Sequence, residues 1–96
     1  MPNVAFINGA FVPLAEAKVS IEDRGFQFGD GVYEVIRTYN GRPFALENHL
    51  ARLDRSATAL DLTQPYSRAE WTEHVLEGLR RAAYAEAKVY IQLAFD

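Results

Sequence analysis

Two Asn-Gly pairs, each set between runs of β-forming side chains, constrain the fold of this chain most strongly. Asn8-Gly9 separates residues 4–7 from residues 10–12, and Asn40-Gly41 follows residues 32–39. A two-residue loop with positive backbone φ angles matches the twist of paired strands, and asparagine and glycine adopt such angles readily. The sequence therefore predicts two antiparallel β-hairpins.

The second hairpin carries polar side chains on both faces of its first strand, and it returns through residues 42–44. Because side chains alternate along a strand, one face holds Tyr33, Val35, Arg37 and Tyr39, and the other holds Val32, Glu34, Ile36 and Thr38. Neither face is wholly apolar, which indicates that one of them lines a cavity. Tyr33 and Arg37 offer a phenol and a cation on one face, although a surface tyrosine beside a salt-bridged arginine is an equally good interpretation.

Two helices and a strand follow the hairpins. Apolar side chains recur at steps of three and four over residues 46–60, which is the stripe of an amphipathic helix. Ser67 and Glu70 have the spacing of a capping box, which predicts a second helix that ends near residue 83. Residues 88–93 then return to period two, which is typical of a strand.

This order of elements predicts an α+β fold, with a largely antiparallel sheet built from hairpins and two helices packed on one face. A chain of 96 residues with 49% hydrophobic side chains fits a single small domain over residues 1–96. The last predicted strand runs towards Asp96 without a turn or a cap. We therefore expect a truncated chain.

Composition excludes several classes of protein. A net charge of −3 lacks the basic excess that binding to a phosphate backbone needs, so we expect no nucleic-acid partner. The absence of cysteine excludes disulfides, thiolate metal sites and cysteine nucleophiles. Neither a leader peptide nor an apolar run of membrane-spanning length is visible, so we expect no membrane association and a cytoplasmic location.

Arg52 is a candidate ligand for an anion. It precedes Leu53 of the apolar stripe, so its aliphatic stem can cover apolar surface while its guanidinium reaches the edge of a pocket. The planar fork of five donors suits a phosphate or a carboxylate. An arginine on the flank of a helix is also typical of a solvated surface charge, and both interpretations stay open.

The histidines and lysines offer little chemistry by themselves. His49 and His74 come from different helices without an HExxH motif, so we expect no metal site and interpret both as helix-surface histidines. Lys18 and Lys88 are the two lysines of the chain, and both are predicted to be exposed. Their number matters because a covalent carbonyl cofactor needs a lysine amine.

Residues 21–31 contain three glycines within seven positions. Glycines allow positive φ angles and a close approach of the backbone, so this segment either lines a ligand site or reaches a partner subunit, with Phe26 and Phe28 as apolar contacts. A long connection anchored by two aromatic rings is the alternative. The segment has neither the P-loop pattern nor the GxGxxG pattern of nucleotide-binding loops.

Four segments in this order resemble the N-terminal domain of the class IV, fold type IV, pyridoxal-phosphate aminotransferases: residues 7–9, 23–37, 49–53 and 89–92. The resemblance runs from about residue 4 to residue 92. The Gly-Asp-Gly-Val-Tyr-Glu-Val run is most similar to D-amino-acid (D-alanine) aminotransferases. Branched-chain aminotransferases and aminodeoxychorismate lyase are also similar, commonly with phenylalanine where Tyr33 stands.

The resemblance implies pyridoxal 5'-phosphate as the cofactor, with Arg52 in contact with its phosphate. It also implies that Tyr33 and Val35 line the substrate pocket. Residues 26–31 would belong to a loop near the entrance of the active site, where the subunits of a homodimer approach each other. The implied substrates are small amino acids and 2-oxo acids.

The same resemblance places the Schiff-base lysine and the acidic partner of the pyridine nitrogen in a second, C-terminal domain. Neither Lys18 nor Lys88 matches the lysine position, so we expect no catalytic residue in this chain and no transamination by this chain alone. After Gln92 the sequence reads Leu-Ala-Phe-Asp, where the family usually continues with a Thr-Arg-Gly-like segment. This departure leaves the identity of the substrate open.

The expected function is that of the small domain of a D-amino-acid aminotransferase, which transfers an amino group between a D-amino acid and a 2-oxo acid. A branched-chain aminotransferase or an aminodeoxychorismate lyase of the same family is the first alternative. The second alternative is a noncatalytic module that dimerises through its unpaired last strand, because an exposed sheet edge favours pairing.

Overall fold

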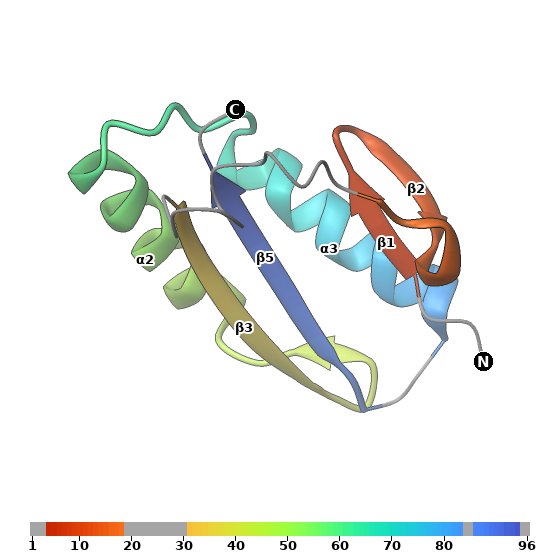
Figure 1. Cartoon of the computed structure of the whole chain (residues 1–96). Helices are drawn as coiled ribbons and strands as arrows, with labels where there is room; N and C mark the ends of the chain where they lie inside the picture. Colours follow the sequence, from red (N-terminus) through yellow and green to blue (C-terminus); the bar gives the residue numbers. More distant parts are fainter. Residues whose placement is uncertain (1–3, 19–30, 84–85, 95–96) are drawn as a thin grey trace.

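Figure 1 shows the fold as a computed structural model, which describes residues 4–18, 31–83 and 86–94. Two α-helices and antiparallel strands confirm the predicted α+β class. In chain order the elements are β1 (Val4–Ile7), β2 (Ala10–Pro13), the short 3₁₀ helix η1 (Leu14–Glu16), β3 (Gly31–Tyr39), β4 (Arg42–Pro43), α2 (Leu46–Ala59), α3 (Arg68–Ala82) and β5 (Lys88–Ala94).

Both Asn-Gly pairs turn the chain as predicted. All four residues of Asn8-Gly9 and Asn40-Gly41 have positive φ angles, between 48° and 90°. These angles belong to the tight hairpin turn whose twist matches that of the strands it joins. Strand β1 therefore pairs with β2, and Tyr39 of β3 lies opposite Arg42 of β4.

The described strands form two sheets, where the sequence predicts one. In the larger sheet β3 is central, and it pairs with β5 from Gly31 opposite Ala94 to Arg37 opposite Lys88. The β1–β2 hairpin is a separate sheet that packs against α3. Its aromatic side chains make this contact, because the Phe6 ring centroid lies 4.5 Å from that of His74. The hairpin is thus attached by packing and not by strand pairing.

The core lies between the helices and one face of the β3–β5 sheet (Figure 1). Burial alternates along β3, where positions 34, 36 and 38 are buried and their neighbours 33, 35, 37 and 39 are exposed. Helix α2 contributes the predicted leucine stripe, and α3 contributes every fourth residue. The buried cluster consists of Ile36, Leu50, Leu53, Trp71, Val75, Leu79 and Ile91.

The start of α3 is fixed by the predicted capping box. The Ser67 side chain accepts a hydrogen bond from the backbone of Glu70, and the Glu70 carboxylate accepts one from the Ser67 backbone N–H. These two bonds satisfy backbone donors that the first turn of a helix leaves free. Trp71 Nε1 then donates to Gln64 at 2.9 Å, which ties the buried indole to the segment between the helices.

No helix in the described part of the chain has both the length and the apolar character that crossing a membrane requires.

The core makes a direct prediction for stability. Leu53 is fully buried between α2 and the sheet, so Leu53→Ala is expected to lower the free energy of unfolding by about 2–5 kcal/mol through lost burial and a residual cavity. Leu76→Ala is the control, because Leu76 is exposed on α3 and its truncation should change stability by about 0.5 kcal/mol. Urea unfolding of both variants checks the difference. Equal losses in the two variants would contradict the assigned core.

Candidate functional site

A carboxylate is buried against the core on the inward face of β3. Glu34 shares this face with Val32, Ile36 and Thr38, and its side chain is only 3% exposed. A buried carboxylate is destabilising unless charged and hydrogen-bonded partners compensate it. The partners of Glu34 therefore define the chemistry of this region.

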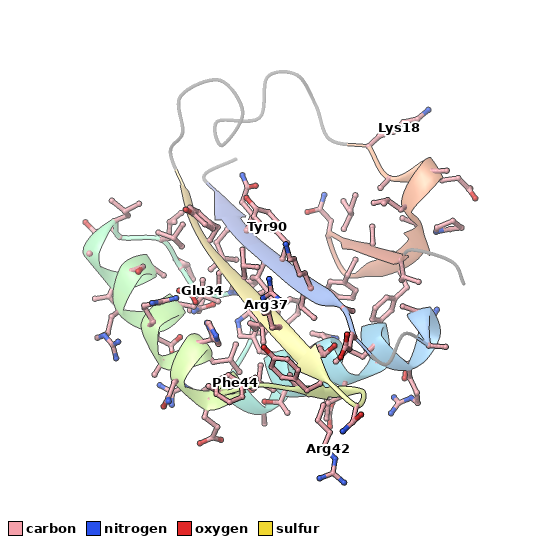
Figure 2. The ribbon with its side chains drawn as sticks, turned by 90° about the horizontal axis from the view of Figure 1, so that it is seen from below. Lys18, Glu34, Arg37, Arg42, Phe44 and Tyr90 are labelled. Carbon is pink, nitrogen blue, oxygen red and sulfur yellow. The ribbon has the colours of Figure 1, made fainter. Side chains whose placement is uncertain are left out.

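Both partners come from one flank of α2, three residues apart. Arg52 donates from Nε to Glu34 Oε2 at 2.7 Å and from Nη2 to Oε1 at 2.8 Å, which is a bidentate ion pair. His49 Nδ1 lies 2.6 Å from Oε1. An ionised carboxylate only accepts hydrogen bonds, so Nδ1 of His49 carries the proton. We call these three residues the Glu34 cluster, and Figure 2 shows Glu34 on the side of β3 that faces α2.

Glu34 and Arg52 stay charged at neutral pH. Hydrogen bonding from Arg52 lowers the pKa of Glu34, and this effect and the smaller one from His49 outweigh burial, which acts in the opposite direction. The hydrogen bonds to Glu34 in turn raise the pKa of Arg52, and Tyr33 adds a smaller electrostatic contribution.

Arg52 contacts both the buried carboxylate of Glu34 and the solvent. Its side chain is 60% exposed, although its Nε–Nη2 edge is bound to the buried Glu34. Within the described ranges no hydrogen bond reaches Nη1 of Arg52, so Glu34 and His49 leave that nitrogen unused. Both interpretations left open by the sequence stay open, because Arg52 is largely exposed, as a surface charge would be, and is also bound to Glu34 through one edge.

Tyr33 and Val35 flank Glu34 in sequence and project from the opposite face of β3. They are 65% and 40% exposed, and the Tyr33 ring stacks on Tyr90 of β5 with centroids 5.9 Å apart. Strand β4 pairs with β3 only at Thr38 and Tyr39, and α2 packs on the stretch of β3 that carries Glu34. The structure thus places Tyr33, Val35 and Arg52 around the same short stretch of β3.

The expected cavity on a β3 face does not form within the described part of the chain. The inward face is filled by the core, and the outward face is open, as the exposure of Tyr33 shows. A shallow hollow elsewhere lies on α3, and none of Tyr33, Val35 and Arg52 lines it. Its lining residues are Glu73, His74, Leu76, Glu77 and Arg80.

Both histidines lie on helices as predicted, but they are half-buried and in contact with other side chains. His49 is bound to Glu34, and His74 lies 4.5 Å from the ring centroids of both Phe6 and Tyr66. The two lysines, at positions 18 and 88, are exposed as predicted. The glycine-rich segment lies outside the described residues, apart from Gly31 at the start of β3.

Glu34 is the residue of the site that the sequence does not reveal. The sequence gives one indication of its role. Glu34 is a charged residue that alternation places on the same face of the strand as the apolar residues Val32 and Ile36. This indication was insufficient because each face of this strand carries polar groups. Choosing the buried face required the contacts with α2, which the strand pattern does not contain.

Comparison with known proteins identifies the family. Residues 31–96 match the family model described as Amino-transferase class IV. The chain belongs to the class IV aminotransferases. Relatives of this class IV chain include the D-alanine aminotransferases of Listeria monocytogenes serotype 1/2a (strain 10403S), 44% identical over 87 residues, and of Staphylococcus haemolyticus, 45% identical over 87 residues. Both alignments cover 91% of this chain, and they cover 30% and 31% of the two relatives.

Solved structures agree with this assignment. The branched-chain aminotransferase of the thermophilic archaeon Thermoproteus uzoniensis superposes with a TM-score of 0.80 and 31% identity, over 96% of this chain and 32% of that chain. The fold IV-transaminase of Curtobacterium pusillum superposes with a TM-score of 0.69 and 39% identity, over 85% of this chain and 30% of that chain. The class IV aminotransferase chain described here therefore spans about a third of the length of its relatives. The resemblance predicted from the motifs is confirmed.

The Glu34 cluster predicts how stability depends on pH. The pKa of Glu34 is lowered in the folded state, so its contribution is complete above the unfolded value of 4.5 and is lost as the pH falls through the lower folded value. Glu34→Gln is expected to lower the free energy of unfolding by about 1–3 kcal/mol at pH 7, because the buried network loses its negative charge and one of the two oxygens that accept hydrogen bonds. The difference between wild type and Glu34→Gln should shrink below pH 4.5.

Denaturant unfolding at a series of pH values measures this difference. Glu73→Gln is the control, because Glu73 is exposed on α3 outside the cluster. Glu70 and Glu77 also have a lowered pKa, and they remain in both proteins, so their contribution cancels in the difference. A difference that stays constant from pH 7 down to acid would contradict the ionised, paired state of Glu34.

Proposed function

We propose that this chain is the domain that binds cofactor phosphate and substrate in a pyridoxal 5'-phosphate-dependent D-amino-acid aminotransferase. Such an enzyme transfers an amino group between a D-amino acid and a 2-oxo acid. The family membership and the D-alanine aminotransferase relatives support this assignment. When bound, pyridoxal phosphate supplies the conjugated system that stabilises negative charge at the α-carbon of the amino acid.

The observation that carries the proposal is the guanidinium of Arg52. Its side chain is largely exposed, and its Nε–Nη2 edge is held by a buried carboxylate. A guanidinium in a fixed plane offers parallel N–H donors that match the oxygens of a phosphate. The residues present therefore fit a cofactor phosphate, and Arg52 would hold it.

Tyr33 and Val35 are proposed to form the substrate side of the same site. Both lie next to Glu34 in the sequence and project from the outward face of β3, where a ligand can reach them. Val35 would provide apolar contact to a small side chain, and the Tyr33 hydroxyl would donate a hydrogen bond to a polar group of the substrate. In this arrangement one strand orients cofactor and substrate relative to each other.

The proposed complete enzyme contains more than this chain. Lys18 and Lys88 are exposed, and neither belongs to the Glu34 cluster, so the lysine that binds the cofactor covalently would come from the part of the enzyme that the relatives have beyond this third. We accordingly propose that this chain alone does not catalyse transamination. We further propose a cytoplasmic homodimer, which is compatible with the absence of cysteine.

A branched-chain aminotransferase is the second candidate. The structural similarity to the Thermoproteus uzoniensis enzyme, with a TM-score of 0.80, supports it. The D-alanine aminotransferases are more similar in sequence, at 44–45% identity against 31%. We therefore favour the D-amino acid as the amino donor.

Arg52→Ala is expected to weaken retention of pyridoxal phosphate by the complete enzyme by about 10- to 100-fold, because a charge-assisted contact to the phosphate is lost. Arg52→Lys should give an intermediate loss, because it keeps the charge and removes the planar fork. Visible absorbance after dialysis measures the bound cofactor. Arg55→Ala, which removes an exposed arginine from the same helix, is the control. Unchanged retention in Arg52→Ala would refute the role assigned to Arg52.

The second expectation concerns the substrate of the complete enzyme. With 2-oxoglutarate as the acceptor, kcat/KM should be at least about tenfold higher for D-alanine than for L-leucine, because discrimination of this size is within reach of one pocket. Product analysis with aminodeoxychorismate tests the lyase alternative in parallel. A preference for L-leucine would instead establish the branched-chain activity, and turnover of aminodeoxychorismate alone would establish the lyase.

A further inference from the structure

The donors of Arg52 divide into two sets. Its Nε–H and one N–H of Nη2 point at Glu34, and together they form the bidentate pair. The guanidinium is planar, so two bonds from one edge fix the plane and direct the remaining N–H groups of Nη1 and Nη2 away from Glu34. The orientation of the free edge is therefore set by the position of the carboxylate.

The carboxylate itself has little freedom. Glu34 lies on β3 within the paired segment, opposite Ile91 of β5, and its side chain is 3% exposed. His49 donates to the same oxygen, Oε1, that accepts from Arg52 Nη2, so rotation of the carboxyl group would break bonds to both partners. A long and largely exposed arginine side chain would otherwise sample many rotamers.

From this geometry we propose that Glu34 is a positioning residue. It holds the guanidinium of Arg52 in one orientation, with His49 holding Glu34, and thereby presents a single edge of Arg52 to the phosphate of the cofactor. The inference rests on the proposed function for its ligand. The ordering of Arg52 itself does not depend on that ligand.

The ion pairs of Glu77 on α3 provide a comparison with the pair of Glu34 and Arg52. Glu77 on α3 accepts from Arg80 and Arg81, which lie one turn further along the same helix, and all three side chains are at least one-third exposed. Such local pairs stabilise a helix only weakly. Glu34 differs because it is buried and because it joins a strand to a helix.

The negative charge of Glu34 also repels a phosphate. This repulsion weakens phosphate binding, whereas the ordering of Arg52 by Glu34 strengthens it. Glu34 binds the inner edge of the guanidinium, so the cation lies between the carboxylate and an anion at the outer edge. Water around the exposed Arg52 screens the repulsion between Glu34 and the phosphate. Water cannot hold the guanidinium of Arg52 in one orientation once Glu34 is removed. We therefore expect the loss of Glu34 to weaken phosphate binding.

The test uses the complete enzyme freed of its cofactor and nitrogen-15 NMR of the arginine Nε–H groups, with the Arg52 signal assigned by its loss in Arg52→Lys. The probes are pyridoxine 5'-phosphate and pyridoxine, which lack the aldehyde and so cannot react with a lysine. In Glu34→Gln we expect the Arg52 Nε–H to exchange with water about tenfold faster, because a hydrogen bond to a buried charged group is lost. Pyridoxine 5'-phosphate should bind about three- to tenfold more weakly, and pyridoxine binding should not change.

Glu77→Gln is the matched control and should leave exchange at Arg52 and both affinities unchanged. Unchanged exchange at Arg52 in Glu34→Gln, or faster exchange without weaker phosphate binding, would overturn the inference. Equal weakening for pyridoxine and its phosphate would also overturn it, because it would indicate a merely structural role. If the Gln variant unfolds, Glu34→Asp keeps the charge, and slow exchange at Arg52 in that variant supports positioning whereas fast exchange overturns it.

A failure of the proposed function is distinguishable from these outcomes. If the wild-type complete enzyme freed of its cofactor binds pyridoxine 5'-phosphate no better than pyridoxine, the phosphate role of Arg52 is refuted. The exchange rate of the Arg52 Nε–H in the ligand-free enzyme then still decides whether Glu34 orders the guanidinium.

Discussion

One buried carboxylate sets the relation between the sheet and the first helix. Glu34 is the charged side chain on the inward face of β3, where Thr38 is the other buried polar group, and α2 docks with Arg52 and His49 towards it. This rotation of α2 about its axis also turns Leu50 and Leu53 of the leucine stripe towards the core. An apolar residue at position 34 would often give equal or better stability than a buried ion pair. The pair is therefore better explained by what it does to Arg52 than by stability.

Alternation along β3 separates two tasks within one strand. Even-numbered positions face the helices, and they carry the core and the carboxylate that orders Arg52. Odd-numbered positions face outward, and they present Tyr33 and Val35. A shift of the strand by one residue would exchange the two sets and destroy both the core and the site. Pairing of β3 with β5 over seven residues fixes this register.

Local patterns were sufficient for the secondary structure of this chain and insufficient for its site. The Asn-Gly turns, the leucine stripe and the Ser67–Glu70 capping box each act over a few residues, and the structure contains all of them. The pairing of Glu34 with Arg52 joins positions 18 residues apart, and it depends on the docking of α2 onto β3. The attachment of the β1–β2 hairpin to α3 likewise includes the contact of Phe6 with His74, which no single segment encodes. Arg52 itself was identified by resemblance and by the chemistry of its side chain, not by periodicity.

The outward face of the sheet shows why the proposed site needs more than this chain. Aromatic side chains gather there, with Tyr33 stacked on Tyr90 and Tyr39 in edge contact with Phe44, and all four are exposed. Several exposed aromatic side chains on one face are typical of a surface that another body covers. Catalysis by a bound cofactor also requires that water be excluded, which an open sheet face does not achieve. In the proposed enzyme, the part that supplies the lysine would therefore also close this face, and one docking event would complete the pocket and bury the exposed rings.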